Sequence, residues 1–253
     1  MALLAIDTAT STLALAVGDD DGHVLAAWSS RIPKMHATYV NPLIDEMLAT
    51  VGFDLRDIKG IIVGMGPGSY TGIRIGVTVA KVLAIARGIA VVGQSSLASA
   101  AYALRLQYGL VAVLWDARRH SAYTVAYRVQ YGAFVEVLSE EKRDIASFMG
   151  LLAHEVQTGE AVYLLGDVAG VAAQEYASAF SCNPVIVYDA TASVYAENLL
   201  SLGYLELHKK MRSLEVSDHG KEAHVLVPRY LQLAEAEARW LEKRRGSSSN
   251  ESD

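Results

Sequence analysis

Residues 61–76 read IIVGMGPGSYTGIRIG, an apolar run that passes through a glycine-rich turn into the start of a helix. The apolar run has the pattern of a strand buried on both faces, and the helix is expected to continue to about Arg87. Backbone amides at such a turn can hold an anion. The spacing of its glycines matches neither the P-loop nor G-x-G-x-x-G, and Ser69 does not fit the nucleophile elbow. A tight structural turn and an anion site are therefore the two interpretations of this stretch.

Apolar segments on both sides of this stretch repeat one order of elements twice. Upstream, three strands and a helix are expected at residues 2–6, 13–17, 24–28 and 36–50. Downstream, after a helical stretch at 97–106, strands and helices are expected at 110–115, 121–129, 133–138, 145–156, 162–165, 171–179 and 185–187. The repeated order βββαβα predicts an α/β protein of two related lobes, with sheets flanked by helices and a site between the lobes.

The expected lobes divide the chain at about residue 107. An N-terminal lobe spans 1–107, a smaller C-terminal lobe spans 108–230, and a helix with a tail follows at 231–253. The last eight residues are rich in serine, a composition typical of a disordered end.

Composition argues against several functional classes. The 253 residues carry a formal net charge of −6, whereas a protein that binds nucleic acid by itself is expected to present a basic surface. Cys182 is the single cysteine, which fits a reducing compartment. No apolar stretch has the unbroken length of a membrane span. We therefore expect a cytoplasmic protein that meets nucleic acid only through a partner.

The stretch 66–76, together with Ile6-Asp7-Thr8, resembles the bacterial TsaB (YeaZ) family. Further matching pieces are His36 before Pro42-Leu43-Ile44, Ser95-Ser96-Leu97, Asp116-Ala117-Arg118-Arg119 with Tyr123 and Tyr127, and Pro228-Arg229-Tyr230-Leu231. The resemblance is dense over residues 2–127 and thin over 130–225. Gln232 stands where the family usually has an arginine, so no role is assigned to that position.

This resemblance implies a two-lobed actin/Hsp70-like (ribonuclease H-like) fold with mixed sheets flanked by helices. It also implies a non-catalytic subunit that binds and activates a TsaD-type enzyme, which places threonylcarbamoyl on an adenosine of tRNA. The implied partners are this TsaD-type subunit, a TsaE-type ATPase in the larger complex, and tRNA through the complex only, with a homodimer when the chain is alone. The alternatives are an ATP-dependent enzyme or a glycoprotease-like metallopeptidase of the same fold, and a homodimeric sugar- or nucleotide-binding protein.

In the implied fold, the segments that hold nucleotide phosphates lack their usual glycines. Ala9 replaces glycine in the segment 7–10, and Asp116-Ala117-Arg118 also lacks one, so side chains hinder a phosphate from approaching the backbone. The candidate residues of this degenerate nucleotide cleft are Asp7, Thr10, Gly66, Gly68, Asp116 and Gly166. ATP or ADP is expected to bind only weakly, or at an interface of the complex.

Neither a metal site nor a catalytic residue is expected. TsaD-type relatives hold a metal with two histidines four residues apart on one helix, and the corresponding stretch here is Ser95-Ser96-Leu97-Ala98-Ser99-Ala100. Among the seven histidines, no two are three or four residues apart.

The helix at 72–87 carries a small residue at every fourth position. Such a ridge lets another helix approach closely, and that neighbour is either the chain's own helix 36–50 or a second subunit. We expect these two helices to lie side by side and to form the main subunit contact. The candidate interface residues are His36, Val40, Leu43, Met47, Gly72, Ile73, Gly76, Val77, Ala80 and Ala84.

Overall fold

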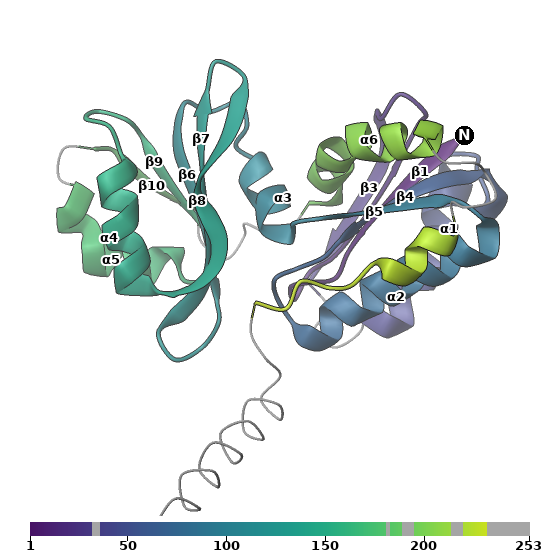
Figure 1. The fold of residues 1–253 in the computed structure, drawn as a ribbon, viewed down its shortest axis with the longest axis horizontal. Helices are drawn as coiled ribbons and strands as arrows, with labels where there is room; N and C mark the ends of the chain where they lie inside the picture. The colour runs from purple at the N-terminus through teal and green to yellow at the C-terminus, as the bar shows by residue number, and fades with distance from the viewer. Residues whose placement is uncertain (32–35, 181–182, 189–194, 214–219, 232–253) are drawn as a thin grey trace, which may run out of the picture.

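The computed structural model describes residues 1–31, 36–180, 183–188, 195–213 and 220–231. These residues form two five-stranded mixed sheets that lie beside one another, each flanked by helices (Figure 1). The expected C-terminal helix and tail, apart from Leu231, lie outside the described residues, as do Cys182 and Gln232. Among the described helices, none combines the length and the apolar character that crossing a bilayer requires.

The first sheet has the strand order β3-β2-β1-β4-β5. Its strands are β1 (Ala2–Asp7), β2 (Leu13–Gly18), β3 (Val24–Ser30), β4 (Ile58–Gly64) and β5 (Ala90–Gln94). The first three strands pair antiparallel as two hairpins, and β4 and β5 extend the sheet in parallel to β1. β1 and β2 are buried along their whole length, which explains why their sequences are continuous apolar runs.

Helices cover both faces of the first sheet. They are α1 (His36–Thr50), α2 (Tyr70–Arg87) and α6 (Ala196–Ser213). On one face, Leu4 of β1 joins a cluster that includes Ile44 of α1 and Ile73 of α2. On the other face, Leu3 joins a cluster with Leu199 of α6, which Figure 1 shows across the sheet from α1 and α2. Successive residues of β1 therefore serve two separate apolar layers.

The second sheet has the order β10-β9-β6-β7-β8. Its strands are β6 (Gly109–Asp116), β7 (Ser121–Gln130), β8 (Ala133–Asp144), β9 (Val162–Leu165) and β10 (Val185–Tyr188). Its helices are α3 (Ser96–Tyr102), α4 (Ile145–Glu155) and α5 (Ala169–Tyr176). Across both lobes, the described chain also has the short 3-10 helices η1 (Leu55–Asp57), η2 (Ala177–Phe180) and η3 (Lys221–Val225). α3 packs on the face that looks toward the first sheet, and α4 and α5 pack on the opposite face (Figure 1).

The predicted order βββαβα is confirmed in both halves. The predicted extent of the second lobe, residues 108–230, is wrong at its C-terminal end. After β10 the chain returns to the first lobe, where α6 packs on β1, β2, β4 and β5, and η3 packs on α2. Leu199, Leu200 and Leu207 bury fully in doing so, because they cover a sheet face that nothing else in the described chain covers.

A partly buried carboxylate joins the two lobes. Glu140 of β8 accepts a hydrogen bond from the Ser95 hydroxyl at the start of α3, and its Oε1 lies 3.9 Å from Nη1 of Arg229. Arg229 is in turn held on the first lobe, where its amide donates to the carbonyl of Met65 at 3.0 Å. Burial raises the pKa of Glu140, while the bond from Ser95 and the charge of Arg229 lower it.

Candidate functional site

The hairpin after β1 is built around one buried carboxylate. Asp7 is fully buried, its Oδ1 accepts from the amide of Ala9 at 2.8 Å, and its Oδ2 accepts from the Ser96 hydroxyl at 2.6 Å. A side chain at Gly64 would place its Cβ 1.9 Å from that Oδ2, so only glycine fits beside it. Burial raises the pKa of Asp7 to about 6, although both hydrogen bonds and nearby His36 oppose this shift.

The glycine-rich loop packs directly on this hairpin. The Ser69 amide donates to the carbonyl of Ala9 at 2.7 Å, and a Cβ at Gly68 would lie 2.1 Å from that same oxygen. Gly66 is bonded to Ser96, through its amide at 3.2 Å and its carbonyl at 3.0 Å. Ala9 is consequently buried by the chain itself. For the glycine-rich stretch in residues 61–76, the tight structural turn is therefore the better of the two interpretations.

The other two cleft segments meet on the second lobe. The amide of Asp116 donates to Oδ1 of Asp167 at 2.7 Å, and the amide of Arg118 donates to Oδ1 of Asp116 at 2.7 Å. A Cβ at Gly166 would lie 2.0 Å from the carbonyl of Leu114, so this position requires glycine. The six cleft candidates therefore form two groups, Asp116 with Gly166 on one lobe and Asp7, Thr10, Gly66 and Gly68 on the other.

The turn that follows Asp116 keeps a left-handed backbone without glycine. Arg118, Arg119 and His120 have φ angles of 64°, 55° and 59°. Such angles are uncommon for residues with a Cβ. Ordinary turn hydrogen bonds hold the segment, including one from the Ser121 amide to the Arg118 carbonyl at 3.1 Å. The turn therefore adopts a left-handed backbone although the segment 116–118 lacks a glycine.

The ridge of small residues faces the core, which corrects the expectation that it meets a second subunit. Gly72 and Gly76 lie on the hairpin, since a Cβ on them would come within 2.2 Å of the Thr8 carbonyl and 2.5 Å of the Thr8 hydroxyl. That hydroxyl donates to the Gly72 carbonyl at 2.7 Å and accepts from the Gly76 amide at 3.0 Å. Ala80 and Ala84 are fully buried. The small residues thus do allow a close approach, and at Gly72 and Gly76 the close neighbour is the hairpin after β1.

The remaining interface candidates are also mostly internal. His36, Val40, Met47, Ile73 and Val77 are all at least nine-tenths buried within the chain, and only Leu43 is partly exposed. Nε2 of His36 lies 3.0 Å from the carbonyl of Thr10, so this nitrogen carries the proton of the hydrogen bond. The residues that a partner can reach on α1 and α2 are their outward neighbours.

Those outward neighbours line a groove between α1 and α2. Its volume is about 410 Å³, and it is lined by Ala37, Val40, Tyr70, Thr71, Arg74, Ile75, Thr78 and Val79. Tyr39, between Ala37 and Val40 on α1, is also exposed, as are Val82 and Ile85 farther along α2. At one end of the groove, the guanidinium of Arg74 lies 4.0 Å from the ring centre of Tyr70, and its Nε donates to the Tyr230 hydroxyl at 2.9 Å. We call this surface the α1–α2 groove.

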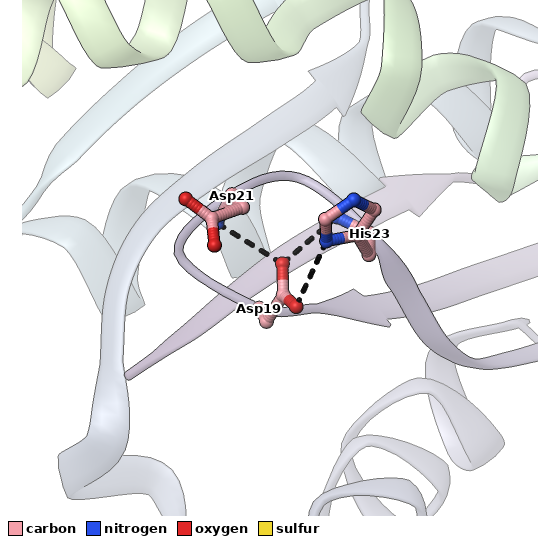
Figure 2. A group of neighbouring side chains, drawn as sticks. All are labelled: Asp19, Asp21 and His23. Carbon is pink, nitrogen blue, oxygen red and sulfur yellow. Dashed lines mark hydrogen bonds and ion pairs between the residues drawn. The ribbon is translucent and has the colours of Figure 1, made fainter.

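The acidic turn between β2 and β3 gathers three side chains that could ligate a metal, two carboxylates and one imidazole (Figure 2). Asp19, Asp21 and His23 each place a ligand atom within 4.8 Å of the others. Oδ1 of Asp19 already accepts from the amides of Asp21 and His23, at 3.0 and 2.8 Å, and its Oδ2 lies 3.2 Å from Nδ1 of His23. These are the bonds of a tight turn, and the absence of a bound metal stays a prediction.

Known proteins resemble this chain in sequence and in fold. The family model for TsaD, tRNA N6-adenosine threonylcarbamoyltransferase, matches residues 30–240. The tRNA threonylcarbamoyladenosine biosynthesis protein TsaB of Bacillus subtilis is 32% identical over 97% of this chain and 100% of its own length. The chain belongs to the TsaB family. The TsaB of Haemophilus influenzae is 31% identical over 64% of this chain and 74% of that protein.

Solved structures agree with this assignment. YeaZ from Pseudomonas aeruginosa superposes with a TM-score of 0.68 at 26% identity, over 90% of this chain and 99% of that one. A second Pseudomonas aeruginosa structure, described as similar to the peptidase YeaZ, has a TM-score of 0.71 at 27% identity and covers 91% of this chain and 99% of that chain. The predicted TsaB family and the two-lobed actin/Hsp70-like fold are both confirmed.

Sequence reasoning missed three residues of this TsaB-family chain that organise its site. Thr8 and Ser96 bond across 64 to 89 positions, and Glu140 bonds across 45. Ser96 could have been noticed as a buried-strand neighbour within Ser95-Ser96-Leu97, but nothing in the sequence pairs it with Asp7. Glu140 sits among charged residues of β8, where composition alone indicates an exposed strand.

Replacing Asp7 with asparagine is expected to remove part of the acid stabilisation of this TsaB-family chain. The folded protein holds the proton of Asp7 up to about pH 6, whereas the unfolded chain releases it near 3.8. The contribution of Asp7 to stability is therefore fully present below about pH 3.8 and is lost as the pH rises to about 6, a change of roughly 3 kcal/mol. Urea unfolding of wild type and Asp7→Asn at pH 4 to 7 measures the difference.

The difference in unfolding free energy between wild type and Asp7→Asn isolates the effect of Asp7. Burial also raises the pKa values of Glu140 and Asp167, but both residues are present in the two proteins. Asp21→Asn, at an exposed position, is the matched control and should follow wild type. If Asp7→Asn loses stability between pH 4 and 6 as steeply as wild type does, Asp7 is not the titrating group.

Proposed function

We propose that this chain acts in tRNA threonylcarbamoyladenosine biosynthesis as a non-catalytic subunit that binds and activates a TsaD-type enzyme. The observation that carries the proposal is full-length similarity to TsaB proteins, combined with a match to the TsaD family model over most of the chain. A chain that shares its partner's fold can present the same pair of helices to it that the partner presents in return. Two such subunits can then associate about a pseudo-two-fold axis.

The state of the cleft supports a role without catalysis. Productive ATP binding in this fold needs backbone amides of the first hairpin to face the phosphates, but the Ala9 amide donates to Asp7 and Ala9 is fully buried. The start of α3 presents Ser95 and Ser96, whose hydroxyls bond Glu140 and Asp7. Weak ATP or ADP binding, or binding at an interface of the complex, is part of this proposal.

The α1–α2 groove is the proposed contact surface for the TsaD-type subunit. It is apolar over most of its length, with exposed Tyr70 at one end and Val82 and Ile85 farther along α2. Apolar surface of this kind is typical of a contact with another protein. In the cytoplasm the same surface serves a second copy of the chain when the partner is absent. A TsaE-type ATPase and tRNA would join through the complex, since the net charge of −6 does not favour direct binding of tRNA.

Reconstitution tests the proposed function. The TsaD-type subunit of the same organism, this chain, and their mixture are each supplied with tRNA and a threonylcarbamoyl donor, and threonylcarbamoyladenosine is measured by mass spectrometry. We expect product from the mixture and almost none from either protein alone. Product formed by this chain alone would make it an enzyme, and equal product from the TsaD-type subunit with and without this chain would exclude an activating role.

A further inference from the structure

Residues 220–230 run along α2 toward the junction of the two lobes, and we call them the strap (Figure 1). We propose that the strap is a latch between the lobes: Arg229 pairs with Glu140 of the second lobe when the lobes draw together, and Tyr230 links that movement to the end of the α1–α2 groove. The latch can be measured on the chain alone, and only its consequence for a partner subunit rests on the proposed function.

The strap is fixed to the first lobe. Leu226 packs against the apolar cluster beneath α2. Nζ of Lys81 donates to the carbonyls of His224 and Leu226, at 3.1 Å each. The amide of Arg229 then donates to the carbonyl of Met65 at 3.0 Å. The strap therefore belongs to the first lobe up to the point at which it faces the second.

The charge pair between the lobes is not closed in this structure. Oε1 of Glu140 lies 3.9 Å from Nη1 of Arg229, which is beyond hydrogen-bond distance. The side chain of Glu140 is 10% exposed, and among the described residues its Oε1 has no hydrogen-bond partner. A buried oxygen without a donor is costly. An approach of about 1 Å would form a charge-assisted hydrogen bond, so drawing the lobes together satisfies Glu140.

The second lobe presents two carboxylates to Arg229. The hydroxyl of Tyr127 lies 3.5 Å from Oε2 of Glu136, on the same strand as Glu140. Burial raises the pKa of Tyr127, and the charges of Glu136 and Glu140 raise it further, whereas the charge of Arg229 lowers it. The two carboxylates and the guanidinium therefore act on one another across the junction, and their attraction favours closing.

Tyr230 joins the same point of the strap to the groove. Its ring centre lies 4.9 Å from that of Tyr70, and its hydroxyl accepts from Nε of Arg74 at 2.9 Å. Tyr70 and Arg74 both line the α1–α2 groove. Because Arg229 and Tyr230 are consecutive, holding Tyr230 in place also positions Arg229 for Glu140. A subunit bound over Tyr70 and Tyr230 would therefore favour the closed pair, and the closed pair would favour that subunit in return.

Distances between spin labels on the two lobes test the latch. Cys182→Ser carries two new cysteines at exposed positions, Glu46→Cys on α1 and Val171→Cys on α5, and pulsed electron-resonance spectroscopy measures the distribution of distances between their labels. We expect Arg229→Gln to widen this distribution about twofold, because states with separated lobes become more populated. Arg87→Gln, at an exposed position at the end of α2, is the matched control and should leave the width unchanged. An unchanged width in Arg229→Gln would overturn the proposal.

A double variant tests whether the two side chains act as one pair. Glu140→Gln should widen the distribution as much as Arg229→Gln does, and both changes together should widen it no further. Glu175→Gln, at an exposed position on α5, is the matched control. Widening that adds up in the double variant would show that the residues act separately and would refute the latch. If Glu140→Gln does not fold, the result for Arg229→Gln decides.

The link to the groove has its own readout. Tyr230→Ala should widen the distribution of distances between the lobes as well, because it removes the ring that holds the end of the strap on Tyr70. Tyr39→Ala, which removes an exposed ring from α1, is the matched control and should have no effect. If Tyr230→Ala leaves the distribution unchanged, the groove and the lobe junction are not coupled. None of these measurements involves a TsaD-type subunit, so their failure is distinguishable from failure of the proposed function.

Discussion

Replacing Ala80 with glutamate is expected to unfold the first lobe. Ala80 is fully buried between α2 and the sheet, among side chains that include Val63 and Val77. A carboxylate there would have no partner and no access to water, and leaving a charge uncompensated in a core costs several kcal/mol, a large part of the stability of a domain this size. Circular dichroism and urea unfolding of Ala80→Glu measure the loss.

Thr71→Glu is the control for the substitution itself, because Thr71 is exposed in the first turn of the same helix, where an acidic residue is tolerated. A folded Ala80→Glu protein with the stability of wild type would show that α2 does not pack as described. The milder change Gly76→Ala should also destabilise, since its Cβ would lie 2.5 Å from the Thr8 hydroxyl.

Replacing Thr78 with glutamate is expected to leave the protein folded and to weaken its contact with a TsaD-type subunit. Thr78 is exposed and lines the α1–α2 groove, only two residues from buried Ala80. A negative charge buried at the centre of an apolar contact weakens association by about 2 kcal/mol or more, roughly a 30-fold loss of affinity. Affinity is measured by titration calorimetry, and folding by thermal unfolding of the variant alone.

The matched control is Thr158→Glu, an identical change at an exposed threonine of the second lobe. It should bind the partner as wild type does. If Thr78→Glu retains full affinity, the partner uses another surface and the assignment of the groove fails. If the variant unfolds, Val82→Glu, at another exposed position on the same helix, provides the second measurement.

The arrangement of strands was predictable from the sequence because buried strands leave continuous apolar runs. Residues 2–6 and 13–17 show such runs, and both became fully buried strands of the first sheet. The glycine-rich stretch was predictable for a related reason. Its spacing of glycines is required by atoms that lie within about 2 Å of any added Cβ, as at Gly64, Gly68 and Gly72.

The direction of the small-residue ridge could not be predicted. A small residue at every fourth position indicates that something approaches one face of the helix closely, but not what that neighbour is. Contact with the hairpin at Thr8 and contact with a second subunit leave the same pattern in the sequence. The contact surface that we propose lies one or two positions away, at Thr78 and Val79, which carry no comparable pattern.

In α6, by contrast, the sequence does carry the pattern of a helix with one buried face. Leu199, Leu200, Gly203 and Leu207 are spaced as one face of a helix, and all four are buried. Periodicity alone does not say which sheet such a face covers, so even a correct helix would have been placed in the second lobe with its chain neighbours. The hydrogen bond between Asp7 and Ser96 could not be predicted for the same reason, because it joins positions 89 residues apart.

The return of α6 to the first sheet has a consequence for how the protein is made. β5 ends at residue 94 and α6 begins at residue 196, so a ribosome exposes one apolar face of the first sheet long before its cover exists. At about 5–20 residues per second, the intervening stretch takes on the order of 5–20 s to synthesise. The second sheet, which is continuous in the chain, can complete itself within that interval. The nascent chain is therefore most vulnerable to aggregation at its earliest segment, and any premature stop before α6 would leave that face permanently open.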